Sequence, residues 1–114
     1  KVYRGKAGQK FVSQMNEAEK AATRALQDAN LAAAMAEPAD LLILDEAGSA
    51  WELDMVDPEL LQRAVRERPA GQECVLTAHA PVQWMLDAAD YVTEMKCRRH
   101  PYQKGIAARQ GIEY

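Results

Sequence analysis

The sequence predicts an α/β fold in which a parallel sheet is flanked by helices. Helical and strand-like segments alternate along the chain, which is typical of parallel sheets connected by helical crossovers. A continuous apolar run, Leu41–Leu44, is bounded by turn-forming residues and has the length of a strand. The 114 residues suit one domain with a modest core, so we expect residues 1–114 to form a single α/β domain.

The predicted central strand, Leu41–Leu44, runs directly into two acids. Four apolar residues in a row predict burial on both faces of the strand. Asp45 and Glu46 then lie at its carboxyl end, the edge where open α/β sheets bind ligands. Hydrophobic residues followed by Asp-Glu have the form of a Walker B strand, whose acid holds Mg²⁺ beside a nucleotide phosphate. The pattern alone fits equally well a buried strand that ends in a solvated acidic turn.

Composition and charge exclude some classes of function for this protein. The net charge is −3 and the pI is about 5.4, so composition shows no footprint of a nucleic-acid-binding protein. No apolar run approaches the length of a membrane span and no secretory signal is visible, so we expect neither nucleic acid nor a membrane as a partner. The two cysteines are too few and too scattered for a disulfide framework, which favours a reducing, cytoplasmic setting.

The first ten residues are basic, contain two glycines and begin with Lys1 rather than Met. Residues 5–10 superficially resemble a phosphate loop. They lack the glycine spacing and the Lys-Ser/Thr pair with which such a loop cradles phosphates and holds Mg²⁺. We therefore expect an ordinary loop here, and a chain that has been cut or processed upstream of Lys1.

A long helix is predicted from Asn16 to about Ala36. Asn16 is a good N-cap, and Glu19 three residues later completes a capping box. Pro38 ends the helix. Alanines at helical spacing predict a stripe that packs against the sheet, with the polar side chains opposite. The stripe comprises Ala18, Ala21, Ala22, Ala25, Leu26, Ala29, Ala32, Ala33 and Ala36.

The remaining segments continue the alternation. Residues 47–57 are predicted to be a loop, and Asp57-Pro58 starts a helix whose apolar face includes Leu61 and Val65. We expect a second strand over residues 73–77, a short helix that Pro81 opens over residues 81–89, and a third strand over residues 90–95. Basic residues then concentrate in the tail, at Lys96, Arg98, Arg99, Lys104 and Arg109.

Two strand ends are expected at one edge of the sheet. The first offers Asp45 and Glu46, and the second offers Thr77 and His79. An acid for Mg²⁺, a hydroxyl and a ring that accepts and releases protons would suit phosphate chemistry. His79 is equally compatible with a simple turn residue.

Other residues with chemical potential have simpler explanations. Trp51 and Trp84 are expected to be packing residues rather than stacking platforms. Cys97 and His100 lack the further ligands that a zinc site needs.

Several stretches resemble one family, the ATP:corrinoid adenosyltransferases of the cobalamin pathway. They are the Walker B strand, the helix ending at residues 66–69, the strand at residues 75–77 and the run over residues 88–95. The tail over residues 96–102 and 105–114 is similar to the family's ending and is the most specific of them. The similarity covers residues 11–114.

The resemblance implies a RecA-like P-loop fold and a homodimer, and it is compatible with a reductase partner. It implies transfer of the 5′-deoxyadenosyl group from Mg-ATP to a Co(I) corrinoid, in biosynthesis or salvage, with release of triphosphate. By resemblance, Asp45 falls at the Mg²⁺ position and Glu46 at the adjacent acid that faces the corrinoid. Thr77 begins a turn near the triphosphate, and Phe11 lies near the lower face of the corrin ring.

The sequence departs from the family pattern in three places. The family's phosphate loop lies upstream of every segment seen here, Ala78-His79 replaces a Gly-Arg pair, and Ser13 stands where related sequences often have tryptophan. Histidine lacks the permanent forked charge of arginine. We therefore expect a RecA-like fold without its N-terminal phosphate-loop unit.

Two rival functions remain beside the transferase. One is a non-catalytic binding or assembly module derived from the family. The other is a different RecA-type ATPase that uses Asp45 and Glu46 for hydrolysis, which the tail over residues 105–114 argues against.

Overall fold

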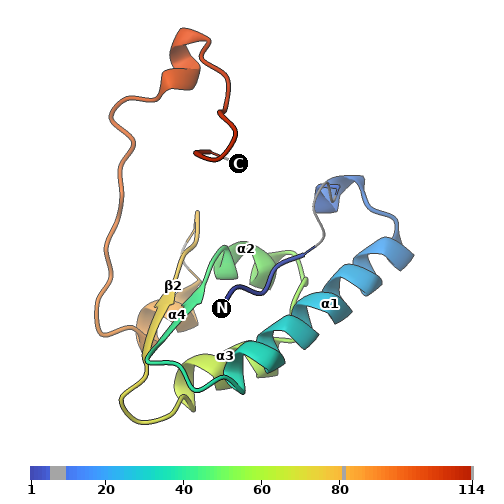
Figure 1. The fold of residues 1–114 in the computed structure, drawn as a ribbon, viewed down its shortest axis with the longest axis vertical. Helices are drawn as coiled ribbons and strands as arrows, with labels where there is room; N and C mark the ends of the chain where they lie inside the picture. Colours follow the sequence, from blue (N-terminus) through green and yellow to red (C-terminus); the bar gives the residue numbers. More distant parts are fainter. Residues whose placement is uncertain (6–9, 81, 114) are drawn as a thin grey trace.

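The computed structural model describes residues 1–5, 10–80 and 82–113. A small α/β body is followed by an arm, residues 89–113, that runs away from it (Figure 1). The elements are η1 (Val12–Gln14), α1 (Glu17–Met35), β1 (Leu41–Leu44), α2 (Ala47–Glu52), α3 (Pro58–Arg66), β2 (Glu73–Leu76), α4 (Gln83–Ala88) and η2 (Pro101–Lys104). Most of the loop predicted at residues 5–10, and Pro81, lie outside the described residues.

The sheet consists of β1 and β2, which pair in parallel with Leu41 opposite Glu73 and Leu44 opposite Leu76. This confirms the predicted α/β character and the parallel pairing. Because the strands are parallel and in register, their carboxyl ends meet at one edge of the sheet.

Burial of β1 on both faces was a wrong prediction. Leu42 is buried and Leu44 packs against the core, but Leu41 and Ile43 are 50% and 60% exposed. Successive side chains of a strand point to opposite faces, and helices cover only the face of Leu42 and Leu44. The predicted third strand is also wrong: residues 90–95, all within the described part of the chain, form no strand and are exposed.

Helix α1 begins as predicted but packs differently. Asn16 accepts a hydrogen bond from the Glu19 backbone N–H, and the Glu19 side chain accepts one from the Asn16 N–H, so the capping box is confirmed. The alanine stripe is not the packed side, because the buried residue of α1 is Leu31, with Met35 beside it. Leucine and methionine bury far more apolar area than alanine, so they decide how the helix is rotated.

The segment predicted to be a loop after β1 contains a short helix, α2, whose first two residues are buried. Helix α3 starts at Pro58 with Asp57 as its N-cap, as predicted, and buries Leu61, Ala64 and Val65. Residues from α1, α2 and α3 form the core with the inward residues of both strands and of α4. None of the helices in the described part of the chain is long and apolar enough to span a membrane.

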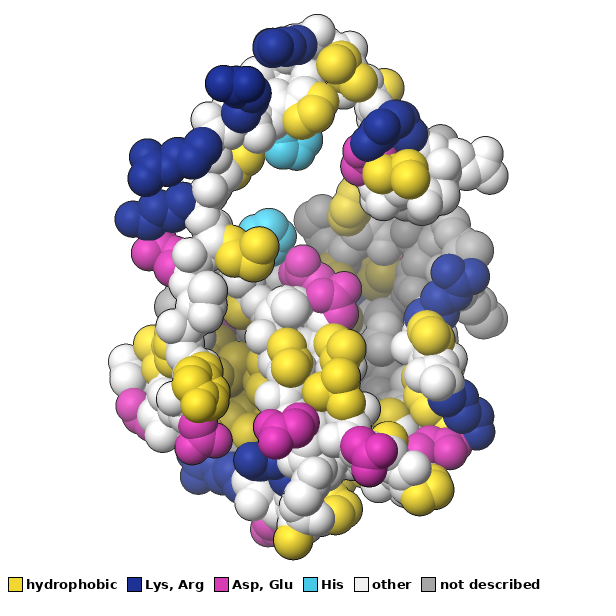
Figure 2. Space-filling model, turned by 60° about the vertical axis from the view of Figure 1, so that its left-hand side comes forward, with side chains coloured by type: hydrophobic (Ala, Val, Ile, Leu, Met, Phe, Trp, Pro, Cys, Tyr) yellow, Lys and Arg dark blue, Asp and Glu magenta, His cyan; other side chains and the backbone are white. Residues whose placement is uncertain are grey.

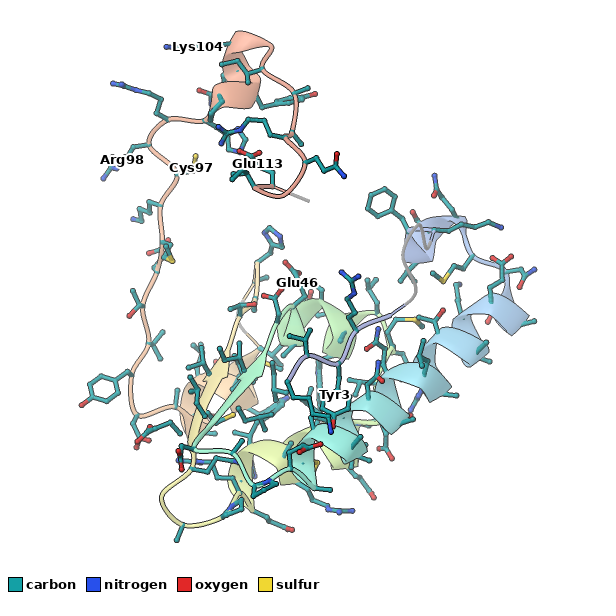
Figure 3. The ribbon with its side chains drawn as sticks, viewed as in Figure 1. Tyr3, Glu46, Cys97, Arg98, Lys104 and Glu113 are labelled. Atoms are coloured by element: carbon teal, nitrogen blue, oxygen red, sulfur yellow. The ribbon has the colours of Figure 1, made fainter. Side chains whose placement is uncertain are left out.

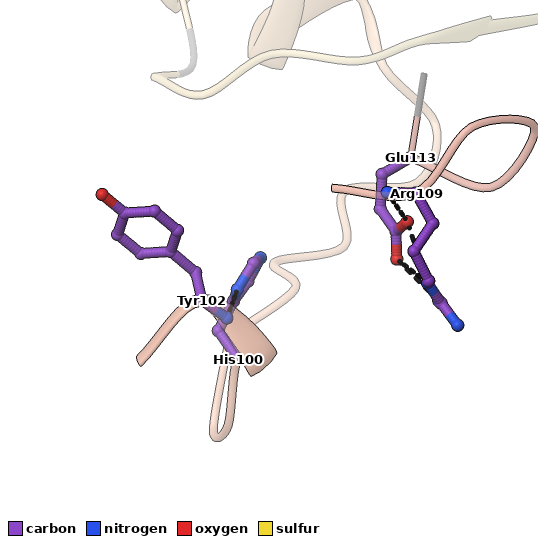
Figure 4. A network of polar contacts seen from close by, with 4 residues as sticks. All are labelled: His100, Tyr102, Arg109 and Glu113. Carbon is purple, nitrogen blue, oxygen red and sulfur yellow. Dashed lines mark hydrogen bonds and ion pairs between the residues drawn. The ribbon is translucent and has the colours of Figure 1, made fainter. Parts of the chain in front are cut away.

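The arm keeps the molecule from being compact. The radius of gyration is 15.6 Å, against about 13 Å for a compact domain of this length. All of residues 89–113 are exposed. The arm is ordered by local contacts, in which the Tyr102 N–H donates to His100 Nδ1 and the Arg109 guanidinium pairs with Glu113 (Figure 4). The Arg109 guanidinium holds the pKa of the Glu113 carboxyl below its usual value.

Candidate functional site at the carboxyl edge of the sheet

Asp45, Glu46, Thr77 and His79 come together at the carboxyl edge of the sheet. Asp45 and Glu46 follow β1, and Thr77 and His79 follow β2. The Thr77 N–H donates to the Leu44 carbonyl oxygen over 3.2 Å and thereby continues the strand pairing by one residue. Parallel pairing therefore places residues that are about thirty positions apart in the sequence within contact of one another.

The Thr77 hydroxyl joins the two acids. Its Oγ1 donates to Asp45 Oδ1 over 2.6 Å and accepts from the Glu46 backbone N–H over 2.8 Å. Asp45 and Glu46 are exposed, so their carboxylates face solvent at this edge rather than the core. The hydroxyl thus orients one carboxylate and fixes the backbone of the next residue.

Glu46 adopts a left-handed backbone conformation, with φ 57° and ψ 27°, immediately before α2. That region costs a non-glycine residue on the order of 1 kcal/mol or more, so the surrounding contacts have to hold it there. The Ser49 hydroxyl donates to Glu46 Oε2 over 2.9 Å, and His79 Nε2 lies 3.5 Å from Glu46 Oε1. Both carboxylate oxygens therefore have a neighbour.

Sequence reasoning missed Ser49. Its only signal was its place three residues after Glu46, which puts the two side chains on the same side once a helix forms at residues 47–52. Because that segment was predicted to be a loop, the three-residue spacing did not predict contact between the two side chains.

The donor set suits a hard cation that is shared with a phosphate. Carboxylate and hydroxyl oxygens are the ligands that Mg²⁺ prefers, and Mg²⁺ usually binds through one or two carboxylates together with substrate phosphates and water. Among the described residues no group of three or more His, Cys, Asp or Glu side chains could hold a metal by itself. The site therefore fits Mg²⁺ bound jointly with a ligand, rather than a metal enclosed by protein.

A hollow of about 760 Å³ adjoins the acids. Its walls are mostly apolar and include the exposed face of β1, and it is lined among others by Tyr3, Phe11, Asn30, Ile43, Asp45 and Glu46. Phe11, the aromatic residue singled out in the sequence, is 79% exposed. The structure thus places Phe11 and the acids on the lining of the same hollow.

The two tryptophans lie elsewhere. The rings of Trp51 and Trp84 contact each other at a tilt of 55° with centroids 5.2 Å apart, and both pack against the core, so their predicted packing role is confirmed.

The basic residues of the arm form a separate feature. In the space-filling view several Lys and Arg side chains line the outer side of the arm, and acidic side chains lie both on the arm and on the body (Figure 2). Arg98 and Lys104 point away from Glu46 (Figure 3). Cys97 is exposed and its Sγ contacts the Arg99 carbonyl oxygen over 3.5 Å.

Comparison with known proteins identifies one family. The sequence matches the family ATP:corrinoid adenosyltransferase BtuR/CobO/CobP over residues 2–114. The corrinoid adenosyltransferase of a Sinorhizobium species is 35% identical over 75 residues, which cover 65% of this chain and 35% of that protein. The corrinoid adenosyltransferase of Pseudomonas aeruginosa is 34% identical over 74 residues, covering 65% and 36%. Corrinoid adenosyltransferase CobA of Salmonella typhimurium is 31% identical over 75 residues, covering 66% and 38%.

The matched segments span little more than a third of the length of these relatives. The family match nevertheless extends over nearly the whole of this sequence, including the tail over residues 96–114. The chain belongs to the ATP:corrinoid adenosyltransferase family.

Proposed function

We propose that this protein transfers the 5′-deoxyadenosyl group of Mg-ATP to a Co(I) corrinoid. The observation that carries the proposal is the contact of Asp45, Glu46 and Thr77 at one edge of the sheet, in a chain of this family. In the reaction a bond forms between the corrinoid cobalt and C5′ of ATP. The C5′–O bond breaks, and triphosphate leaves with the electron pair.

Asp45 is the proposed residue for Mg²⁺, because its carboxylate is exposed and held by Thr77. The cation would neutralise charge on the triphosphate. Glu46 is the proposed catalytic acid on the corrinoid side, and His79 is proposed on the triphosphate side. His79, whose side chain is 87% exposed and whose Nε2 lies 3.5 Å from Glu46 Oε1, is accessible to a bound anion.

The hollow supports a corrinoid site. Its apolar lining, with Phe11 on it, would contact the corrin ring and keep water from the reduced cobalt. Asn30 also lines the hollow, and its Nδ2 has no hydrogen-bond partner among the described residues.

The test is the adenosylation of a chemically reduced corrinoid by the protein expressed from the whole gene, with and without Asp45→Asn. The amide oxygen of asparagine still accepts the Thr77 hydrogen bond, so the melting temperature should change little while turnover falls by about two orders of magnitude. Asp90→Asn, in the exposed arm, is the matched control. Turnover by Asp45→Asn equal to that of the wild type would contradict the proposal. Corrinoid binding by the wild type without any turnover would favour the non-catalytic module.

A further inference from the structure

The Thr77 hydroxyl has one proton and two lone pairs. The proton goes to Asp45 Oδ1, and one lone pair accepts the Glu46 N–H. A hydroxyl engaged in this way has no proton left to donate to a phosphate oxygen. What it offers at this edge is a fixed arrangement of the two acids.

The Ser49 hydroxyl complements this contact. It donates to Glu46 Oε2 from the first turn of α2, while the Glu46 backbone is held by Thr77. The Glu46 side chain is 56% exposed, so packing does not fix it. Its position is set by these polar contacts, together with His79 Nε2 at 3.5 Å.

We propose that Thr77 and Ser49 are positioning residues, with Thr77 orienting Asp45 and the Glu46 backbone and Ser49 orienting the Glu46 carboxylate. The inference rests on the proposed function, because it gives the two acids their roles. It differs from the expectation that Thr77 itself contacts the triphosphate. Thr77 acts through the acids, and its remaining lone pair points to no donor among the contacts the structure describes.

The contacts serve the arrangement of the acids more than global stability. Thr77 is exposed, and hydrogen bonds at an exposed edge exchange readily with water. Residues outside the first coordination sphere that orient a metal ligand typically change metal affinity 10- to 100-fold when they are removed. A role in orienting the acids therefore predicts a change in metal affinity, whereas a role in global stability does not.

The experiment compares Thr77→Val, Thr77→Ser and Ser49→Ala with the wild type. Valine keeps the branched shape of threonine without the hydroxyl, and serine keeps the hydroxyl. Thr93→Val and Ser13→Ala, at exposed positions outside the site, make the same chemical changes and serve as controls. The first readout, without metal, is NMR of the Glu46 amide: its exchange with solvent and the three-bond coupling that reports φ. The second is the affinity for Mn²⁺ in the presence of ATP, from paramagnetic broadening at Asp45.

In Thr77→Val, we expect Glu46 amide exchange to accelerate about tenfold and the coupling to shift away from the left-handed value. We expect Mn²⁺ affinity to fall about tenfold in Thr77→Val. Thr77→Ser and both controls should stay within about twofold of the wild type in each readout. In Ser49→Ala, Mn²⁺ affinity should fall less than in Thr77→Val, because Asp45 keeps its partner.

Unchanged Glu46 exchange and coupling in Thr77→Val would overturn the inference. So would a change in Glu46 with Mn²⁺ affinity preserved, because the contact would then be structural only. If Mn²⁺ does not broaden Asp45 even in the wild type with ATP present, the metal role in the proposed function fails, and the positioning role fails with it. Failure of the proposed function is thus distinguished from failure of the positioning role alone, because it is already seen in the wild type.

Discussion

Gly48 and Ala78 meet across the carboxyl edge of the sheet so closely that a Cβ on Gly48 would lie 2.5 Å from the Cβ of Ala78. Gly48 is the second residue of α2, and its N–H donates to the Thr77 carbonyl oxygen over 3.4 Å. The Ala80 carbonyl oxygen would lie 3.2 Å from the same Cβ. The start of α2 therefore rests against the turn after β2 through a position without a side chain.

We expect Gly48→Ala to destabilise the protein by about 1–3 kcal/mol, because the added carbon has no room and neither neighbour is the end of a flexible side chain. The better helix propensity of alanine offsets only about 1 kcal/mol of this. Adding Ala78→Gly should restore stability to near the wild-type value. Chemical denaturation of the wild type, both single variants and the double variant measures the coupling. A Gly48→Ala variant more stable than the wild type would show that the two segments are not in tight contact.

His79→Arg should strengthen binding of Mg-ATP. Arginine presents a permanent charge and a forked set of donors that match phosphate oxygens, which histidine lacks. Calorimetric titration with Mg-ATP measures the change in affinity, with His100→Arg in the arm as the control. Equal affinities of the variant and the wild type would make His79 a turn residue only.

The two cysteines should differ in reactivity. Cys97 is exposed in the arm, whereas Cys74 lies in β2, where burial raises the pKa of its thiol. A raised pKa and restricted access both slow alkylation, since the thiolate is the reactive form. A thiol reagent at neutral pH should modify one sulfur quickly, and Cys97→Ser should remove that fast phase. Two equal rates in the folded wild type would contradict this; equal rates in denaturant are expected and serve as the control.

The start of α1 should contribute stability that is lost in acid. A hydrogen bond from Lys10, and then one from the Asn16 backbone, lower the pKa of Glu19. A carboxyl whose pKa is lower in the folded state stabilises the protein fully when the pH is above the pKa of the unfolded state, about 4.3. That contribution is lost as the pH falls through the pKa of the folded state. The difference in melting temperature between the wild type and Glu19→Gln should therefore be positive at pH 7 and shrink toward pH 3. A difference independent of pH would contradict the assignment.

A polypeptide of residues 1–114 alone should bind Mg-ATP more weakly than about 1 mM, or about 4 kcal/mol, and should not adenosylate a reduced corrinoid. Phosphate loops direct several backbone N–H groups and a lysine at the phosphates, and the sequence of residues 1–114 contains no stretch with that spacing. Titration of this purified polypeptide with Mg-ATP, followed by the adenosylation assay, tests it. Micromolar binding with turnover would instead indicate a phosphate site within residues 5–10.

The sequence by itself determined the features that depend on a few neighbouring residues. Asn16 and Glu19 define the start of α1, and Asp57-Pro58 defines the start of α3, because capping groups satisfy backbone N–H groups within one turn. The strands β1 and β2 followed from apolar runs between turns. The acids and Thr77 were singled out by their place at the strand ends, and the tail pointed to the family.

Only the tertiary structure decided which of these residues are in contact. The contact of Thr77 with Asp45 depends on the register of two strands about thirty residues apart, which no local pattern specifies. The side of α1 that is packed depends on which element contacts Leu31. Whether residues 90–95 form a strand depends on whether another strand pairs with them. Strand pairing, unlike a helical cap, draws its hydrogen bonds from distant parts of the chain, so its outcome is settled only when the chain has folded.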